Sequence, residues 1–187
     1  MDTRVQTEVG HLSGSRSNSL HFGEYVTQMN NDGRSKVMSG IGIEQCQIKV
    51  LIDVQWRDMD VLGHVNNAEY IRWFESARIA TLGKIEMFNK EGRFKPGMKV
   101  GPILASVSCD FIAPVSFPET VAVGAHVTRI GRSSFNLAYL VVQSSDQKVV
   151  ARGDSVVVQL DYETGRSEPL SEALRTKLDT LVIVSRD

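Results

Sequence analysis

The chain has 187 residues, 42% of them hydrophobic, which is enough for one sizeable core and favours one folded domain. With 21 basic and 22 acidic residues the formal net charge is -1, so neither nucleic acid nor an anionic membrane is expected as a partner. No apolar run approaches the roughly 20 residues that span a bilayer. The two cysteines, Cys46 and Cys109, are too few for a disulfide framework or a zinc site and fit a reducing, cytoplasmic location.

Residues 1–43 differ in composition from the rest of the chain. They contain serine, glycine and scattered charges but few large apolar residues, which predicts a mostly disordered tail before a folded domain at 44–187. No apolar stretch typical of a secretory signal is present, and the acidic residues argue against an organelle transit peptide, although the Arg and Ser content leaves organellar targeting open. Another hypothesis places the native start at Met38.

The first regular element is expected at residues 46–56 (CQIKVLIDVQW), whose alternation is typical of a strand. A polar loop follows, and then apolar residues at helical spacing predict a long helix that ends at Gly83. Its apolar stripe is formed by Tyr70, Ile71, Trp73, Phe74, Ala77 and Ala80, and its other face carries the charge pairs Glu69/Arg72 and Glu75/Arg78.

Four more strands are predicted from alternating apolar residues, followed by a small amphipathic helix that Ser171 caps. We expect Cys109 to be a buried thiol, His126 a surface or interface residue, and Tyr139 and the two tryptophans packing groups. The predicted strands are residues 103–112, 120–130, 133–143 and 148–161.

This order predicts an α+β fold, an antiparallel sheet of about five strands wrapped around one long helix. No βαβ alternation continues along the chain, which disfavours a doubly wound sheet.

The loop RDMDVLGHVNNAEY (57–70) joins the first strand to this helix. Asn66 followed by Glu69 has the spacing of a capping box, so the backbone amides of the first helical turn should point outward at the positive end of the helix. Asp60 just upstream would place a carboxylate near these donors, as acyl transfer requires. The same residues also suit a purely structural turn. Asp58 either anchors the loop or raises the pKa of its neighbour by like-charge repulsion.

The run DMDVLGHVNNAEYIRWFESAR resembles the active-site segment of hotdog-fold acyl-CoA thioesterases of the 4-hydroxybenzoyl-CoA thioesterase type, including those associated with Tol-Pal clusters. The segments CDFIAPVSFPETVAVGAHVTRIGRSSF and ARGDSVVVQLDYETGRSEPL resemble its later strands, so the resemblance covers about residues 47–170. It implies a helix enclosed by a curved sheet, sheets that pair across a homodimer or a homotetramer, and no metal or other cofactor.

The resemblance also implies roles for particular residues. Asp60 matches the catalytic carboxylate, a nucleophile or a general base for water, and the Asn67 amide matches the donor to the thioester carbonyl. Gly63 to Val65 let the backbone approach the substrate, beside Asn66 and Tyr70. His64 matches a catalytic histidine of plant acyl-acyl-carrier-protein thioesterases, but Leu62 replaces the asparagine of that machinery.

Arg129, Arg132, Ser133 and Ser134 resemble the turn that lies near the coenzyme A phosphates at the dimer interface of this family; a solvated turn is the alternative. The expected reaction is hydrolysis of acyl-CoA to a carboxylic acid and CoA. Two alternatives stay open, namely hydrolysis of acyl-acyl-carrier-protein and a non-catalytic module that binds acyl-CoA. The acyl group is not predicted.

Overall fold

The computed structural model describes residues 41–88 and 97–183, all within one unit that spans residues 37–187. The predicted tail therefore lies outside the described residues up to position 40, and position 43 already opens a short 3-10 helix. The elements are η1 (Ile43–Gln45), β1 (Ile48–Asp53), η2 (Trp56–Asp58), α1 (Asn67–Lys84), β2 (Val100–Phe111), β3 (Thr120–Ile130), β4 (Ser134–Gln143), β5 (Val149–Asp161) and α2 (Glu172–Asp179).

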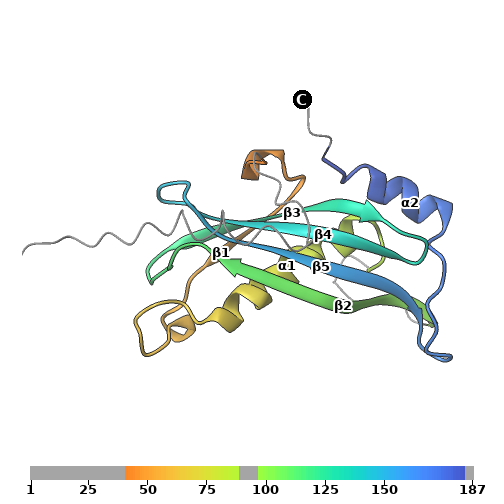
Figure 1. Cartoon of the computed structure of the whole chain (residues 1–187), viewed down its shortest axis with the longest axis horizontal. Coiled ribbons are helices and arrows are strands. Elements are labelled where there is room, and N and C mark those ends of the chain that lie inside the picture. Colours follow the sequence, from red (N-terminus) through yellow and green to blue (C-terminus); the bar gives the residue numbers. More distant parts are fainter. Residues whose placement is uncertain (1–40, 89–96, 184–187) are drawn as a thin grey trace, which may run out of the picture. The chain divides into compact units, whose positions relative to one another are not determined.

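The five strands form one antiparallel sheet in the order β1-β3-β4-β5-β2, which confirms the predicted α+β arrangement (Figure 1). Tight turns join β3 to β4 and β4 to β5, so these neighbours in sequence are also neighbours in the sheet. The chain from β1 to β2 instead passes through α1, and the two strands become the opposite edges of the sheet. Of the helices in the described residues, none has the length and hydrophobicity needed to cross a bilayer.

Helix α1 packs against the sheet through aromatic side chains. Phe74 is fully buried and stacks on Tyr139 of β4, with ring centroids 4.6 Å apart and 11° between the ring planes. A Cβ atom on Gly153 of β5 would lie 2.3 Å from the Phe74 ring, so this glycine permits the close approach of helix and sheet. The predicted inner face of β3 is confirmed, since all its members are 0–1% exposed: Val121, Val123, Ala125 and Val127.

The predicted end of α1 at Gly83 is wrong, because the helix continues to Lys84. The left-handed residue that terminates it is Glu86, with φ of 62°. The amide of Glu86 donates to the carbonyl of Gly83 at 3.0 Å, and the amide of Met87 donates to the carbonyl of Leu82 at 2.9 Å. These two bonds form a Schellman motif, which satisfies the last carbonyls of the helix without a glycine at the left-handed position.

Four side chains differ from their predicted environments. Trp56 is 75% exposed and makes an edge contact with Phe117, whereas Trp73 and Tyr139 are buried as predicted. Both predicted charge pairs of α1 are present, Glu69 with Arg72 at 3.6 Å and Glu75 with Arg78 at 3.9 Å, but Arg78 is buried. Cys109 is only partly buried. His126, expected at a surface or interface, is 5% exposed.

Candidate active site

The loop before α1 folds back on itself as a narrow antiparallel ribbon. Met59 pairs with Val65, and the Asp60 amide donates to the carbonyl of His64 at 2.8 Å. Because side chains alternate across such a ribbon, Asp60 and His64 lie on one side and the buried Val65 on the other. The ribbon thus keeps a carboxylate and an imidazole at the surface while Val65 anchors it in the core.

The carboxylate of Asp60 is held by its own turn. Its Oδ1 accepts a hydrogen bond from the Leu62 amide at 2.8 Å, and its carbonyl accepts one from the Gly63 amide at 3.1 Å. Gly63 has φ of 79°, a conformation that glycine adopts without strain. Asp60 is half-buried. One carboxylate oxygen therefore orients the group, and Oδ2 is available to a substrate or a water molecule.

The segment after β2 supports this loop. The carbonyl of Val115 accepts the Val65 amide at 2.8 Å, the Ser116 hydroxyl donates to the carbonyl of Gly63 at 3.0 Å, and the Phe117 amide contacts the Met59 sulfur at 3.3 Å. Sequence reasoning missed these supports, because the stretch after the strand has no signal beyond its two prolines.

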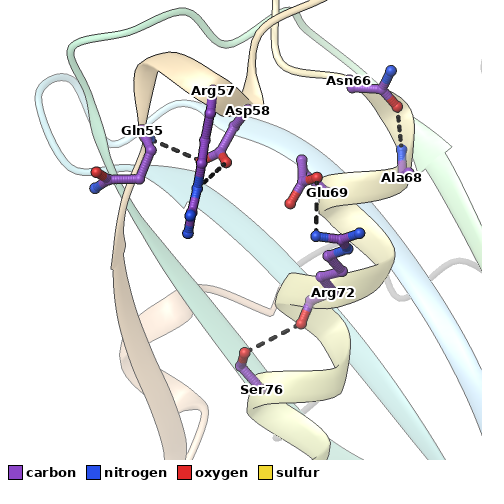
Figure 2. Close-up of polar contacts among 8 residues, drawn as sticks. All are labelled: Gln55, Arg57, Asp58, Asn66, Ala68, Glu69, Arg72 and Ser76. Carbon is purple, nitrogen blue, oxygen red and sulfur yellow. Dashed lines mark hydrogen bonds and ion pairs between the residues drawn. The ribbon is translucent and has the colours of Figure 1, made fainter.

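Asn66 caps α1 as predicted, with its side-chain oxygen accepting the Ala68 amide at 2.9 Å (Figure 2). The reciprocal half of the predicted capping box is wrong. The Glu69 carboxylate lies 3.6 Å from Arg72, and the Asn66 amide donates to the carbonyl of Asp58 at 2.8 Å. The ribbon supplies this acceptor, so Glu69 is not needed for capping.

The Asn67 amide is the donor of the first helical turn that the Asn66 cap does not bind. Asn66 binds the amides of Ala68 and Glu69, each at 2.9 Å, through its side chain and its carbonyl respectively. Within residues 41–88 and 97–183 no group accepts the Asn67 amide. This N–H stands at the positive end of an 18-residue helix, where it can bind a developing oxyanion.

Asp58 anchors the loop, which is one of its two predicted roles. Its Oδ2 accepts the Gln55 amide at 2.8 Å and thereby closes the short η2 helix (Figure 2). The exposed Arg57 lies 3.9 Å from its other oxygen.

Tyr70 lies beneath the first turn of α1 and is 3% exposed. Its ring is 4.6 Å from Trp73 and 5.1 Å from Phe111, centroid to centroid. Burial raises the pKa of its hydroxyl to about 12, so it is neutral at physiological pH. Its surroundings are those of a packing group in the hydrophobic core.

The second predicted group, Arg132, Ser133 and Ser134, lies far from Asp60 in one subunit. The loop at 57–70 is tied to the chain just before β3, whereas these residues follow the other end of that strand. The 11 residues of β3 separate the two places by roughly 34 Å. One copy of the chain therefore does not bring its two predicted groups together.

The described residues also contain a surface groove of about 370 Å³, lined by residues 53–55 and 117–120. It lies beside the loop at 57–70, but none of the predicted site residues lines it. No group of three or more His, Cys, Asp or Glu side chains in the described residues is placed to hold a metal ion.

Comparison with known proteins gives a consistent family. The thioesterase-like superfamily matches residues 54–178, which include the loop at 57–70, α1, strands β2 to β5 and most of α2. The long-chain acyl-CoA thioesterase FadM of Escherichia coli is 24% identical over 138 residues, which make up 74% of this chain and 98% of that protein.

Solved structures agree with this match. A thioesterase of Thermus thermophilus, solved with coenzyme A and zinc, is 32% identical with a TM-score of 0.59, covering 71% of this chain and 98% of that one. A Pseudomonas aeruginosa protein is 30% identical with a TM-score of 0.64, covering 74% of this chain and 93% of that one. The chain therefore belongs to the thioesterase-like superfamily and is a hotdog-fold thioester hydrolase.

Proposed function

We propose that the enzyme hydrolyses acyl-CoA thioesters to a carboxylic acid and CoA, with Asp60 and the Asn67 amide as its reacting groups. The observation that carries the proposal is the Asn67 amide at the start of α1, which no group in the described part of the chain accepts, next to a ribbon that fixes Asp60 through one carboxylate oxygen. Hydrolysis of a thioester needs both parts, a group that activates or replaces water and a donor for the oxyanion.

The proposed reaction begins with the thioester carbonyl oxygen accepting the Asn67 N–H. As a general base, Asp60 takes a proton from water, the hydroxide adds to the carbonyl carbon, and the C–S bond breaks to release CoA as a thiolate, which takes up the proton from Asp60. As a nucleophile, Asp60 attacks the carbonyl carbon and the C–S bond breaks, which releases CoA and leaves a mixed anhydride that water then cleaves to the carboxylic acid and free Asp60. Loss of one oxyanion donor typically lowers the rate by ~10²- to 10³-fold, so the helix end contributes substantially to this scheme.

Other loop residues have supporting roles in the proposal. Gly63 and Val65 shape the backbone beside the substrate, Asn66 directs the first helical turn, and His64 is exposed on the same side of the ribbon as Asp60. At that position the imidazole can contact the thioester or the leaving group. None of these proposed roles requires a metal or another cofactor.

We further propose that the coenzyme phosphates bind the partner subunit's Arg132, Ser133 and Ser134 in a homodimer. Strand β2 forms an edge of the sheet and exposes 44% of Ile103 and 37% of Leu104. A long edge strand with apolar side chains favours pairing with a second copy. A two-fold axis at this edge turns one sheet end for end, so the partner's turn lies at the same end of the joined sheet as the loop at 57–70 and the distance along β3 no longer separates them.

The test is release of free thiol from short-chain, long-chain and aromatic acyl-CoAs by the wild type and by Asp60→Asn. We expect turnover by the wild type, loss of turnover in the variant, and nearly unchanged folding and CoA binding. Activity retained by the pure variant would remove Asp60 from the mechanism. Thiol release from acyl-acyl-carrier-protein but from no acyl-CoA would show that the carrier protein, and not CoA, carries the substrate. Tight acyl-CoA binding without turnover by the wild type would contradict hydrolysis.

A further inference from the structure

The carbonyl groups of the turn between β3 and β4 accept hydrogen bonds from other parts of the chain. The carbonyl of Gly131 accepts a bond from Arg175 Nη2 at 2.7 Å, and the carbonyl of Arg132 accepts one from the same nitrogen at 3.1 Å. The Ser133 carbonyl accepts the amide of Gln159 at 2.8 Å. The negative ends of these peptide groups are thereby paired with donors of the protein and less available to repel an anion at the turn.

We propose that Arg175 is a positioning residue for the binding of the coenzyme phosphates, an inference that rests on the proposed function of this turn. Arg175 belongs to α2 and reaches the turn across the interface between the helix and the sheet. One guanidinium nitrogen joins two successive carbonyls, which fixes the direction of the peptide groups between them. The side chains of Arg132 and Ser133 are oriented by that same stretch of backbone.

Helix α2 is held in place by its cap, its packing and an ion pair, so Arg175 projects from a rigid element. Ser171 caps the helix through the Leu174 amide at 3.3 Å, and Leu178 is fully buried. The Lys177 ammonium lies 2.7 Å from the Glu86 carboxylate, which ties α2 to the segment that follows α1. The carbonyl of Arg132 also accepts the Leu170 amide at 2.8 Å, so the chain leading into α2 and the helix itself hold the same turn.

Charge adds to the geometric effect. The guanidinium of Arg175 brings a positive charge within hydrogen-bond distance of the turn, and the side chains of Arg129 and Arg132 are exposed beside it. A phosphate at the turn would meet this charge with no opposing carbonyl dipole in front of it. Arg175 would thus act on phosphate binding without touching the phosphate, and it would not act on the thioester.

The experiment compares Arg175→Gln with wild type on two substrates, an acyl-CoA and the matching acyl-pantetheine, which lacks the nucleotide phosphates. We expect KM for acyl-CoA to rise by about tenfold, an effect as large as that of roughly one charge-assisted hydrogen bond to the phosphate, with kcat unchanged. Both parameters for acyl-pantetheine should stay at the wild-type value. Lys148→Gln, which removes an exposed positive charge from the turn at the opposite end of β4, is the matched control. It should leave KM and kcat for both substrates at the wild-type value.

An unchanged KM for acyl-CoA, or an equal loss on both substrates, would overturn the proposal, since the latter indicates general damage. If Arg175→Gln does not fold, Arg175→Lys keeps the charge without the planar fork and is judged by the same criterion. If the wild type hydrolyses neither thioester, the proposed function fails, and calorimetry with CoA alone decides on Arg175. About tenfold weaker CoA binding by the variant then supports its role, whereas equal affinity, or no binding by the wild type, refutes it.

Discussion

The exposed amide at the start of α1 depends on Asn66. Its side chain satisfies the Ala68 amide and leaves the Asn67 amide as the remaining donor. Asn66→Ala removes the acceptor, and we expect it to lower the free energy of unfolding by about 1 kcal/mol, measured by urea denaturation. Asn66→Asp keeps an acceptor at the positive end of the helix and should retain wild-type stability. An equal loss in both variants would show that the cap contributes through something other than this bond.

His126 is a buried imidazole on β3 whose two ring nitrogens have no hydrogen-bond partner among the described residues. Burial lowers its pKa from the ordinary value, so it is neutral in the folded chain and takes up a proton on unfolding below pH of about 6.5. Proton uptake by the unfolded state means that the free energy of unfolding falls as the pH drops through this range.

His126→Leu removes both the titration and the unpaired nitrogens. We expect the variant to be at least as stable as wild type at pH 7.5, and its advantage to grow by about 1 kcal/mol by pH 5.5, as measured by urea denaturation at each pH. His126→Gln does not titrate but leaves a buried polar group, so it should lose the pH dependence without the gain at pH 7.5. A constant difference between wild type and His126→Leu over this range would contradict the shifted pKa.

At the scale of elements, the fit between α1 and the sheet depends on Gly153. A Cβ atom there would lie 2.3 Å from the Phe74 ring and 2.5 Å from the carbonyl oxygen of Ser108. Because one of these neighbours is backbone, Gly153→Ala should cost at least about 1–3 kcal/mol, read from the shift in the midpoint of urea unfolding.

Gly83→Ala is the matched control within α1. Its Cβ would meet nothing within 4 Å, so the substitution should stabilise the helix by about 0.5–1 kcal/mol. Destabilisation at Gly83, or tolerance at Gly153, would show that the packing of α1 differs from the one described.

The extent of the elements was largely predictable because alternation and helical spacing are local properties. The alternating stretch at 120–130 gave β3 residue for residue, and Asn66 and Ser171 marked both helix starts. The end of α1 was missed, since a Schellman motif with Glu86 at the left-handed position has no glycine to signal it. The environments of Trp56 and His126 depend on segments distant in sequence, so a local sequence pattern does not predict these environments.

The candidate site likewise has one part that the local sequence predicts and another that depends on tertiary contacts. The spacing of Asp60, Asn66 and Asn67 is local, and the geometry of the loop agrees with its use as a site. The support from Val115 and the action of Arg175 on the turn arise through tertiary contacts and could not be predicted from spacing.

At the scale of the whole molecule, the exposed edge of β2 leads to a prediction about assembly. Leu104→Lys places an ammonium in the proposed interface, where an unpaired buried charge costs several kcal/mol, so we expect the dimer dissociation constant to rise by about 100-fold or more. Leu51→Lys alters an exposed leucine on the opposite edge strand and should leave the dimer intact. Light scattering during size-exclusion chromatography measures both. A monomeric wild type, or equal effects of the two variants, would contradict pairing through β2.

The distance along β3 gives the last prediction, that each site combines residues of two subunits. In an Asp60→Asn homodimer both sites lack the carboxylate, and in an Arg132→Gln homodimer both lack the phosphate contact. A heterodimer of the two has one site with an intact Asp60 from one subunit and an intact Arg132 from the other. After unfolding and refolding together in equal amounts, half the dimers are mixed, so the preparation should recover about a quarter of wild-type acyl-CoA turnover at substrate concentrations below KM. Refolding each variant alone is the control. If both groups of one site belonged to the same subunit, the mixed dimer would have no intact site and mixing would give only the average of the two variants, so the recovery itself measures whether the site is shared.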